Sequence, residues 1–344
     1  MENFTNTLAI SDMRNSTVRQ KLDEGNGSYV IMDHDGSLYD EFGDTFKKRG
    51  YTVKCINLRE PENSDSYNPF TYVKDKYDLD VLVSLFFDYT NPVSQSINDP
   101  FWEKSEKALI SAVIAYKLFE ANQSCTFEKI VEMLQIGKAG LDTLFSEIDE
   151  DSYALRQYHT FDMGSGKACD SIIMSSIIRL EMLCMKNVAD MTGTNNISFD
   201  ELTGTKTAIF IIESDTPLDF LSSLFVAQAF DRVHEHKSDG AMVHVTFIIN
   251  ESCKGDFRNI LIAGGHRISM VYSIPVISTF KTIYKDSWKE KADRFNEIVY
   301  YHVVDSETND WFIDKVKKVT KEELASMSPT DCIIYKNGKV MIIR

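Results

Sequence analysis

Several features that mark common protein classes are missing from this sequence of 344 residues. Its six cysteines include no C-x-x-C pair, which disfavours a zinc or thioredoxin-type site and indicates buried free thiols in a reducing compartment. None of its apolar runs approaches the ~20 residues that a membrane-spanning helix needs. Residues 1–6 lack the pattern of a signal peptide. We therefore expect a cytoplasmic protein whose chain has no membrane span.

Positive charge is also scarce. The chain has 37 Lys and Arg against 52 Asp and Glu, so its formal net charge is −15. Proteins that hold nucleic acid by bulk charge cluster Lys and Arg against the phosphates, so we expect DNA contact to be weak or indirect. His234 and His236 are spaced i, i+2 and would point to different faces of a helix. No further ligands accompany them, and we expect no metal site.

A glycine-rich phosphate-binding loop is missing as well. Such a loop joins the first strand of a nucleotide-binding sheet to a helix and carries a Lys that reaches the phosphates. Upstream of Ser28 the only candidate segment is 8–17 (LAISDMRNST), which contains neither a glycine nor a Lys-Ser/Thr pair. Asp12 in this segment would repel phosphate. We therefore do not expect ATP or Mg²⁺ as a cofactor.

What the sequence does contain is an alternation of strands and helices at both ends. Residues 28–33 have the pattern of a buried strand, 38–49 that of a helix stopped by Gly50, and 51–58 that of a second strand. After Gly193 the alternation returns, with strands predicted at 207–212, 242–249, 268–274 and 298–303, helices at 218–234 and 306–318, and a hairpin around Asn337-Gly338. This order predicts an α/β fold with a parallel sheet flanked by helices.

The middle of the chain, from about residue 77 to residue 186, is almost entirely helical in pattern. In the predicted helix 101–119, Leu109, Ala112, Val113 and Tyr116 follow the i, i+3, i+4, i+7 spacing of one apolar face. We therefore predict an α/β domain that is split in sequence (1–95 and 196–344), with an inserted all-α domain at 96–195.

The most informative motif is the run at 243–251 (VHVTFIINE). An apolar strand that ends in two acids is the Walker B pattern of ATPases, where the first acid holds Mg²⁺ and the second activates the attacking water. Here Asn250 replaces the first acid and carries no charge for a metal, whereas Glu251 keeps the position of the base. The run predicts a nucleotide-site strand with a disabled metal position. Its plainer interpretation is a buried central strand.

A second segment, Gly164-Ser165-Gly166-Lys167, looks like the end of a phosphate-binding loop. However, Ala168 stands where that loop has Ser or Thr, and the segment lies between two predicted helices rather than after a strand. A glycine break that starts a helix near Ala168 is the better interpretation.

With these elements in order, the chain resembles the type IV secretion coupling proteins of the TraG/TraD kind, which couple conjugative DNA transfer to a secretion channel. The stretch 99–109 (DPFWEKSEKAL) is the most specific match and opens the all-α domain of that family. Further motifs match in the same order at 67–70 (YNPF), 206–212, 220–231 and 305–308 (DSET). The resemblance covers essentially the whole soluble part of such proteins. It implies a RecA-like, P-loop-type sheet with an inserted all-α domain.

The departures from the family fall on its nucleotide site. The family's second strand ends in Asp-Pro-Lys-Gly, and the chain has Asp33-His34-Asp35-Gly36. Family arginines align with GGHR at 264–267, where Arg267 is a displaced candidate, and the nucleotide-sensing glutamine aligns with Pro275, which has no side-chain donor. Together with Asp12, Asn250 and Glu251, these residues form a degenerate nucleotide site. Losses at metal, phosphate and sensor positions each cost orders of magnitude in phosphoryl transfer.

The resemblance then implies a coupling-protein-like component that lacks ATPase activity and acts by binding. Its partners would be type IV secretion components, an active coupling-protein paralogue or secreted substrate proteins. The candidate contact residues lie at the start of the all-α domain: Phe101, Trp102, Lys104 and Lys107. Such a protein would work in the cytoplasm, held at the inner face of the membrane through a partner.

Two other hypotheses about the function stay open. The chain could be a weak or assembly-dependent ATPase that drives DNA or protein translocation, with Glu251 as the base and a phosphate loop supplied by a neighbouring subunit. It could also be a folded product with little function, although the hydrophobic pattern continues to Ile343, which argues against a decaying gene.

Overall fold

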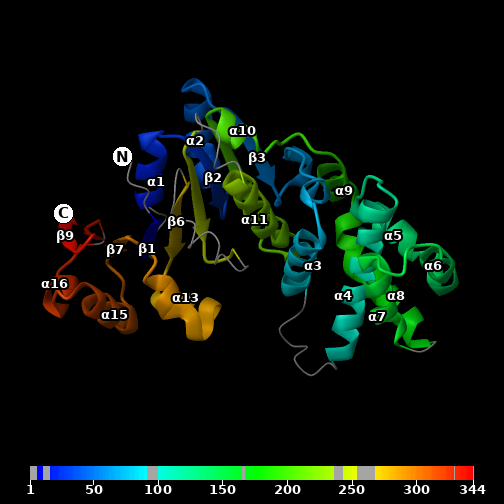
Figure 1. Ribbon diagram of the computed structural model, residues 1–344. Helices are drawn as coiled ribbons and strands as arrows, with labels where there is room; N and C mark the ends of the chain where they lie inside the picture. Colours follow the sequence, from blue (N-terminus) through cyan, green and yellow to red (C-terminus); the bar gives the residue numbers. More distant parts are fainter. Residues whose placement is uncertain are drawn as a thin grey trace. The chain divides into compact units, whose positions relative to one another are not determined.

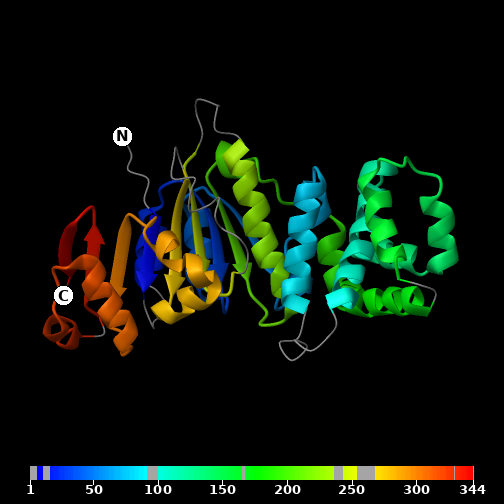
Figure 2. The same cartoon turned by 60° about the horizontal axis from the view of Figure 1, so that its bottom comes forward.

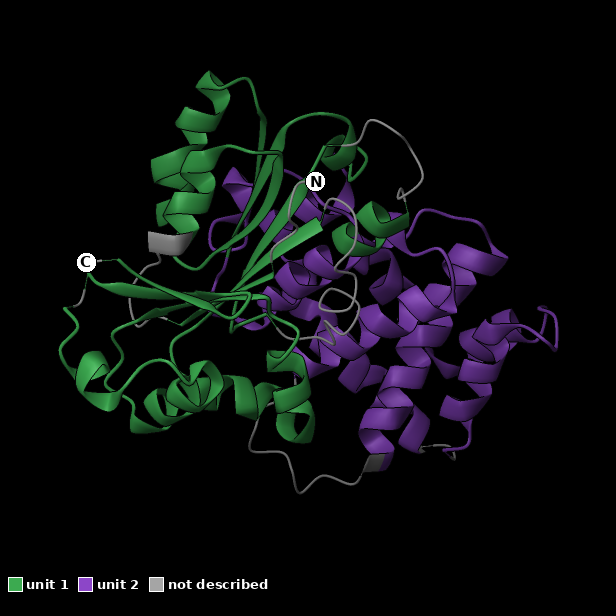
Figure 3. Ribbon diagram, turned by 60° about the vertical axis from the view of Figure 1, so that its left-hand side comes forward, with its two compact units in different colours: residues 1–55, 198–212, 229–344 green, residues 56–197, 213–228 purple. Residues whose placement is uncertain are grey.

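The computed structural model describes residues 6–10, 16–90, 100–164, 167–235, 243–253, 268–328 and 330–343. The contacts within it divide the chain into two compact units, coloured separately in Figure 3. Unit 1 comprises residues 1–55, 198–212 and 229–344, and unit 2 comprises residues 56–197 and 213–228. The expected insertion at 96–195 falls in unit 2, but residues 56–95 and 213–228 group with it. The domain boundaries at 95 and 196 stay a prediction.

The described strands form one sheet in the order β3-β4-β2-β5-β6-β1-β7-β8-β9 (Figures 1 and 2). Strand β1 runs parallel to β6 and β7, β2 runs parallel to β4 and β5, and β5 runs parallel to β6. Their bounds are β1 Asn6–Ile10, β2 Ser28–Asp33, β3 Thr52–Asn57, β4 Thr207–Ile212, β5 Val245–Asn250, β6 Ile268–Ile274, β7 Glu297–Tyr301, β8 Cys332–Lys336 and β9 Lys339–Ile343. The expected α/β fold with a mostly parallel sheet is confirmed.

Helices cover both faces of this sheet, as a parallel sheet with buried strands requires. On one face, α1 (Ser16–Glu24) and α2 (Ser37–Lys48) contribute Val18, Leu22, Phe42 and Phe46 to a cluster with the aliphatic side chains of the central strands. On the other face, Phe247 contacts Phe230 and Tyr272 contacts Phe280, with ring centroids 5.7 Å apart in both pairs. The other helices of unit 1 are α10 Glu201–Gly204, α13 Ile277–Tyr284, α14 Trp288–Ala292, α15 Ser306–Val316 and α16 Lys321–Ala325, with a 3₁₀ turn at Lys285–Ser287.

The antiparallel end of the sheet is the hairpin predicted from Asn337-Gly338. Both turn residues have positive φ, 50° and 77°, which is the conformation that a tight two-residue hairpin turn needs. Strand β8 pairs with β7, and β9 pairs with β8 at the end of the sheet, drawn in red in Figure 2. Three apolar side chains of β9 are exposed: Met341, Ile342 and Ile343.

Unit 2 consists of helices, as the sequence predicted. The helix expected at 101–119 is α-helical only to Ala115, and residues Tyr116–Glu120 continue it as a π turn. Its helices are α3 Lys76–Thr90, α4 Pro100–Ala115, α5 Phe127–Leu134, α6 Gly137–Phe145, α7 Tyr153–Asp162, α8 Lys167–Leu180 and α9 Lys186–Gly193. Helix α11 (Phe220–Glu235) is divided between the units, and 3₁₀ turns lie at Pro61–Asn63, Pro69–Tyr72, Glu181–Cys184 and Pro217–Asp219.

Aromatic contacts explain why residues 56–95 and 213–228 group with these helices. Phe86 of α3 packs edge-on against Phe220, with centroids 5.3 Å apart, and Phe70 packs against Phe127 at 4.9 Å. The buried Tyr67 hydroxyl donates to Gln228 Oε1 at 2.5 Å. These are fully buried core contacts, so the helical unit is larger than the insertion that the family resemblance outlines.

One buried ion pair joins α4 to α8 within unit 2. Arg179 Nε donates to Glu106 Oε2 at 2.8 Å, and the side chains are 15% and 5% exposed. Ser175 also donates to Glu106, while Arg179 reaches Thr90 Oγ1 at 3.1 Å and stacks 4.5 Å from the ring centre of Phe87. The buried carboxylate therefore depends on one arginine for its charge balance.

We expect Arg179→Met to lower the free energy of unfolding by about 3 to 5 kcal/mol, because it leaves the Glu106 carboxylate buried without its counter-charge. Chemical denaturation followed by circular dichroism measures this. Lys186→Met is the matched control, since its ion pair with Asp190 is exposed and its loss should change stability little. Equal losses of stability in the two variants would contradict the conclusion that the Glu106 carboxylate depends on Arg179 for its charge balance.

A close backbone approach fixes the turn before β2. Gly27 has φ +97°, and a Cβ placed there would lie 2.2 Å from the carbonyl oxygen of His244. The next residue, Ser28, donates its N–H to that same oxygen at 2.7 Å. Only glycine allows this turn to lie directly against the residue that precedes β5.

Gly27→Ala should therefore cost at least about 3 kcal/mol of stability, because it combines backbone strain with a backbone clash. Gly50 is the matched control, since its φ is +82° and a Cβ there meets nothing within 4 Å. Gly50→Ala should cost only the strain, about 1 kcal/mol. Urea denaturation of both variants tests this, and a Gly27→Ala cost no larger than that of Gly50→Ala would refute it.

Candidate functional site

Two of the residues predicted from the nucleotide-site motifs, Asp33 and Asn250, lie at the carboxyl edge of the parallel strands. Asn250 ends β5 and lies beside Ser273 of β6, which in turn lies beside Ala9 of β1. Side chains alternate along a strand, so Asp33 at the end of β2 lies on this same face of the sheet. The register thus forms a polar row (Asp33, Asn250, Ser273) at this edge, on the face that α1 and α2 cover.

The Asn250 side chain is engaged within its own turn. Its Oδ1 accepts the backbone N–H of Ser252 at 3.0 Å and the Ser252 hydroxyl at 2.6 Å. This is an Asx turn, a local arrangement that short polar side chains favour. Ser252 was not among the predicted site residues, although the Asn-x-Ser spacing could have indicated it.

Asp33 serves the neighbouring helix. Its Oδ2 accepts the backbone N–H of Tyr39 at 2.8 Å, in the first turn of α2, and the residue is 1% exposed. Burial raises the pKa of the Asp33 carboxyl, while backbone N–H groups of Tyr39, Leu38 and Gly36 act in the opposite direction. The Asp33 carboxylate therefore satisfies a backbone N–H of the first turn of α2.

The remaining predicted residues of this site are placed differently. Glu251 is exposed in the turn directly after β5. Pro275 follows the last residue of β6, and α13 begins two residues later, where the Ile277 N–H donates to Thr308 Oγ1 at 3.0 Å. Asp12 and Arg267 lie outside the described residues.

The predicted contact residues of the all-α domain lie on the first two turns of α4. Phe101 and Trp102 are 37% and 41% exposed and pack edge-on, with centroids 5.8 Å apart, and Lys104 is exposed. Lys107 is half-buried, with its Nζ 2.8 Å from Glu103 and 5.2 Å from the Phe87 ring centre. Three of the four residues are therefore accessible, and Lys107 is held within unit 2.

The glycine-rich segment at 164–167 precedes a helix, as the sequence suggested. Helix α8 begins at Lys167, while Ser165 and Gly166 lie outside the described residues. A Cβ on Gly164 would lie 3.2 Å from the Phe101 ring, so this glycine allows α4 and the start of α8 to approach.

The described part of the chain lacks two other kinds of site. It holds no group of three or more His, Cys, Asp or Glu side chains arranged to bind a metal ion. None of its helices combines the length and apolar character needed to cross a bilayer.

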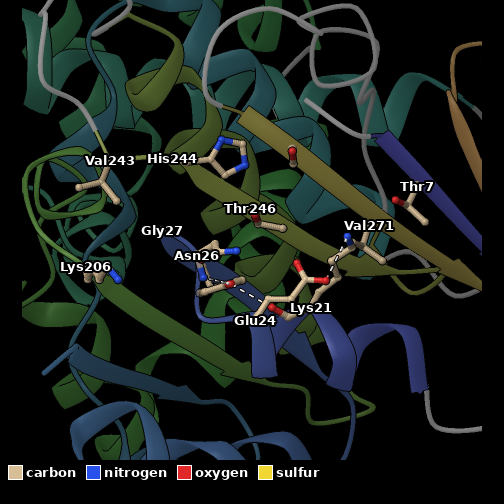
Figure 4. A pocket seen from close by; sticks show the side chains of 12 residues that line it. Thr7, Lys21, Glu24, Asn26, Gly27, Lys206, Val243, His244, Thr246 and Val271 are labelled. Carbon is tan, nitrogen blue, oxygen red and sulfur yellow. Dashed lines mark hydrogen bonds and ion pairs between the residues drawn. The ribbon is translucent and has the colours of Figure 1, made fainter. Parts of the chain in front are cut away.

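A pocket that the sequence did not indicate opens at the opposite, amino edge of the same strands (Figure 4). Its volume is about 590 Å³. It is lined by Thr7, Lys21, Glu24, Asn26, Gly27, Tyr29, Lys206, Val243, His244, Thr246, Ser269 and Val271, all of unit 1. We call it the amino-edge pocket.

Solved structures with a similar fold include conjugative coupling proteins. The bacterial conjugative coupling protein TrwBdeltaN70 has 13% identity over 98% of this chain and 85% of its own, with a TM-score of 0.71. The plasmid coupling protein TrwB in complex with ADP and Mg²⁺ has 13% identity, coverages of 98% and 84%, and a TM-score of 0.69. VirB4 of Thermoanaerobacter pseudethanolicus has 10% identity, coverages of 98% and 88%, and a TM-score of 0.64. These likenesses confirm the expected RecA-like fold.

The sequence itself identifies the family. No curated protein matches it significantly. Residues 21–258, more than half of the chain, match the family described as Type IV secretory system Conjugative DNA transfer. This match spans the candidate contact residues of α4 and both Asn250 and Glu251. The chain therefore belongs to the type IV secretory conjugative DNA transfer family, that of the TraG/TraD-type coupling proteins.

Proposed function

We propose that this coupling-protein-like component of conjugative DNA transfer acts by binding partner or substrate proteins and does not hydrolyse ATP. The proposal rests on the identity and the hydrogen bonds of the Asn250 side chain. Where the family has the acid that holds Mg²⁺, this chain has a neutral amide whose oxygen accepts two hydrogen bonds from Ser252.

The other groups at the carboxyl edge support the same conclusion. Mg²⁺ prefers hard oxygen ligands and is usually held through one or two carboxylates together with substrate phosphates. The Asp33 carboxylate is buried against the start of α2, so among the described residues of the predicted set Glu251 is the one carboxylate that faces solvent there. Residues 8–17 offer no glycine and no lysine for the phosphates. ATP with Mg²⁺ does not fit these residues.

The retained Glu251 is what favours the alternative, a weak or assembly-dependent ATPase. An exposed carboxylate directly after β5 has the position of the base that activates water. A base without a bound nucleotide has no substrate, however, so nucleotide binding decides between the two functions.

An exposed apolar surface on unit 2 supports the binding role. Helices α4 and α8 are joined through Glu106 and Arg179, and both carry large apolar side chains in contact with solvent. These are Phe101 and Trp102 of α4 and, at 58% and 61% exposure, Met174 and Ile178 of α8. We call them the α4–α8 surface. Aromatic and Met side chains of this kind are enriched where proteins bind each other.

The proposed partners are other type IV secretion components, an active coupling-protein paralogue or secreted substrate proteins. With a net charge of −15, DNA contact is weak or indirect in this proposal. The protein would work in the cytoplasm at the inner face of the membrane, positioned there by its partner.

Calorimetric titration with Mg²⁺ and a slowly hydrolysed ATP analogue tests the loss of the nucleotide site. We expect no Mg²⁺-dependent binding below about 1 mM, because the ligands for both phosphate and metal are missing. Glu251→Ala and omission of Mg²⁺ are the controls. Sub-millimolar binding that either control abolishes would favour the ATPase alternative.

Substitutions on the α4–α8 surface test the binding role. Trp102→Ser combined with Ile178→Ser should weaken copurification with a cognate secretion component, active paralogue or substrate protein by about 30-fold, corresponding to about 2 kcal/mol for a buried aromatic anchor. Conjugative transfer in cells that lack the wild-type gene should fall in parallel.

Ile136→Ser is the matched control for this experiment. Ile136 is 50% exposed on unit 2 but lies between α5 and α6, outside the α4–α8 surface. Both variants should unfold at the wild-type temperature. Unchanged copurification and transfer in the double variant, or an equal loss in Ile136→Ser, would remove the α4–α8 surface from the proposal.

A further inference from the structure

The amino-edge pocket is separate from the nucleotide site of the family. It lies where β2, β5 and β6 begin, whereas Asp33, Asn250 and Ser273 lie where the same strands end. Between the two edges, the middle row of this face consists of Ile31, Ile248 and Val271, which belong to the buried core. A molecule in the pocket would therefore not contact the carboxyl edge.

The floor of the pocket carries the hydroxyl side chains of Thr7, Thr246 and Ser269 beside the aliphatic Val271, and the Thr7 hydroxyl donates to Glu297 Oε1 at 3.0 Å. Thr246 of β5 lies in register with Ser269 of β6, and Thr7 of β1 lies in register with Val271. On each strand the residue two positions further along the same face is aliphatic, namely Ile248, Val271 and Ala9. Thr246 and Ser269 thus place hydroxyl groups one step along this face before the aliphatic Ile248 and Val271, so the part of the floor nearest the amino edge is polar.

The rim carries more basic than acidic groups. Lys21 comes from the last turn of α1, and Lys206 and His244 directly precede β4 and β5 (Figure 4). Glu24 is the single carboxylate of the lining, and its Oε1 lies 3.7 Å from Lys21 Nζ. The chain as a whole has a net charge of −15, whereas this lining, with two lysines, a histidine and one glutamate, has more basic than acidic groups.

The second lysine is held only loosely. Lys206 is exposed, and its Nζ lies 3.4 Å from the Gly25 carbonyl oxygen and 5.5 Å from the Tyr51 ring centre. A donor–acceptor distance of 3.4 Å is at the long end for a hydrogen bond. The ammonium group can therefore turn toward an anion in the pocket at little cost.

We propose that the amino-edge pocket binds a small phosphate-bearing molecule. Phosphate oxygens accept both from ammonium groups, as on the rim, and from hydroxyl groups, as on the floor. A cation would be repelled by the ammonium groups of Lys21 and Lys206. The volume of about 590 Å³ lies within the range of small-molecule pockets.

The test is calorimetric titration of the full chain, in EDTA, with inorganic phosphate, ribose 5-phosphate and AMP. At least one of the three should bind with a Kd below about 1 mM. Binding of inorganic phosphate alone would identify a phosphate subsite, and tighter binding of the other two would show that the sugar or base also enters the pocket. Failure of all three to bind would overturn the proposal.

Variants locate the binding in the pocket. Lys21→Ala combined with Lys206→Ala should weaken it by at least about tenfold, and Thr246→Val, which keeps the shape and removes the hydroxyl, should weaken it to a smaller degree. Lys48→Ala, an exposed lysine of α2 outside the pocket, should leave it unchanged. Binding that survives the double substitution would refute the site.

The outcome can be separated from that of the proposed function. Binding in the amino-edge pocket needs no Mg²⁺ and should be unaffected by Glu251→Ala, whereas binding at the carboxyl edge would depend on both. Thermal denaturation of each variant shows that a lost affinity does not come from unfolding.

Discussion

The parallel register of β2, β5, β6 and β1 is the constraint on which the other features of unit 1 depend. Because these strands are paired on both sides and covered on both faces, each side chain has one possible level and one possible face. This places Asp33, Asn250 and Ser273 together at one edge, and Thr246 and Ser269 together at the other. The aliphatic row between them holds the core, so either polar edge can change in sequence without loss of the sheet.

Asn250 illustrates how such a change is tolerated. The turn after β5 needs an oxygen acceptor for the Ser252 N–H, and an amide provides this as well as a carboxylate does. Asp33 likewise has a structural partner in the start of α2. The ends of β2 and β5 are therefore stabilised by hydrogen bonds within the protein, which is how the fold can be retained while residues at its nucleotide-site positions differ from those of the family.

Three central strands were predictable from the sequence, since 28–33, 207–212 and 268–274 have the predicted bounds, whereas the buried strand β1 at Asn6–Ile10 was not predicted. The hairpin turn at Asn337-Gly338 was predictable too, because these two residue types favour the positive φ angles that such a turn needs. The amino-edge pocket was not, because only strand register brings Thr7 near Thr246 and Ser269, which follow it in the chain by more than two hundred residues. The grouping of residues 56–95 and 213–228 with the helices of unit 2 likewise depends on contacts between distant segments, such as that of Phe86 with Phe220.

The last strand of the sheet has a consequence for work with the purified protein. Strand β9 pairs with β8 on one side, and Met341, Ile342 and Ile343 are exposed on it. An apolar edge strand is a template on which another strand can add by backbone hydrogen bonds. Self-association that grows with concentration can therefore arise from edge-to-edge pairing of β9. Charged substitutions on β9 would separate this association from assembly into a secretion complex.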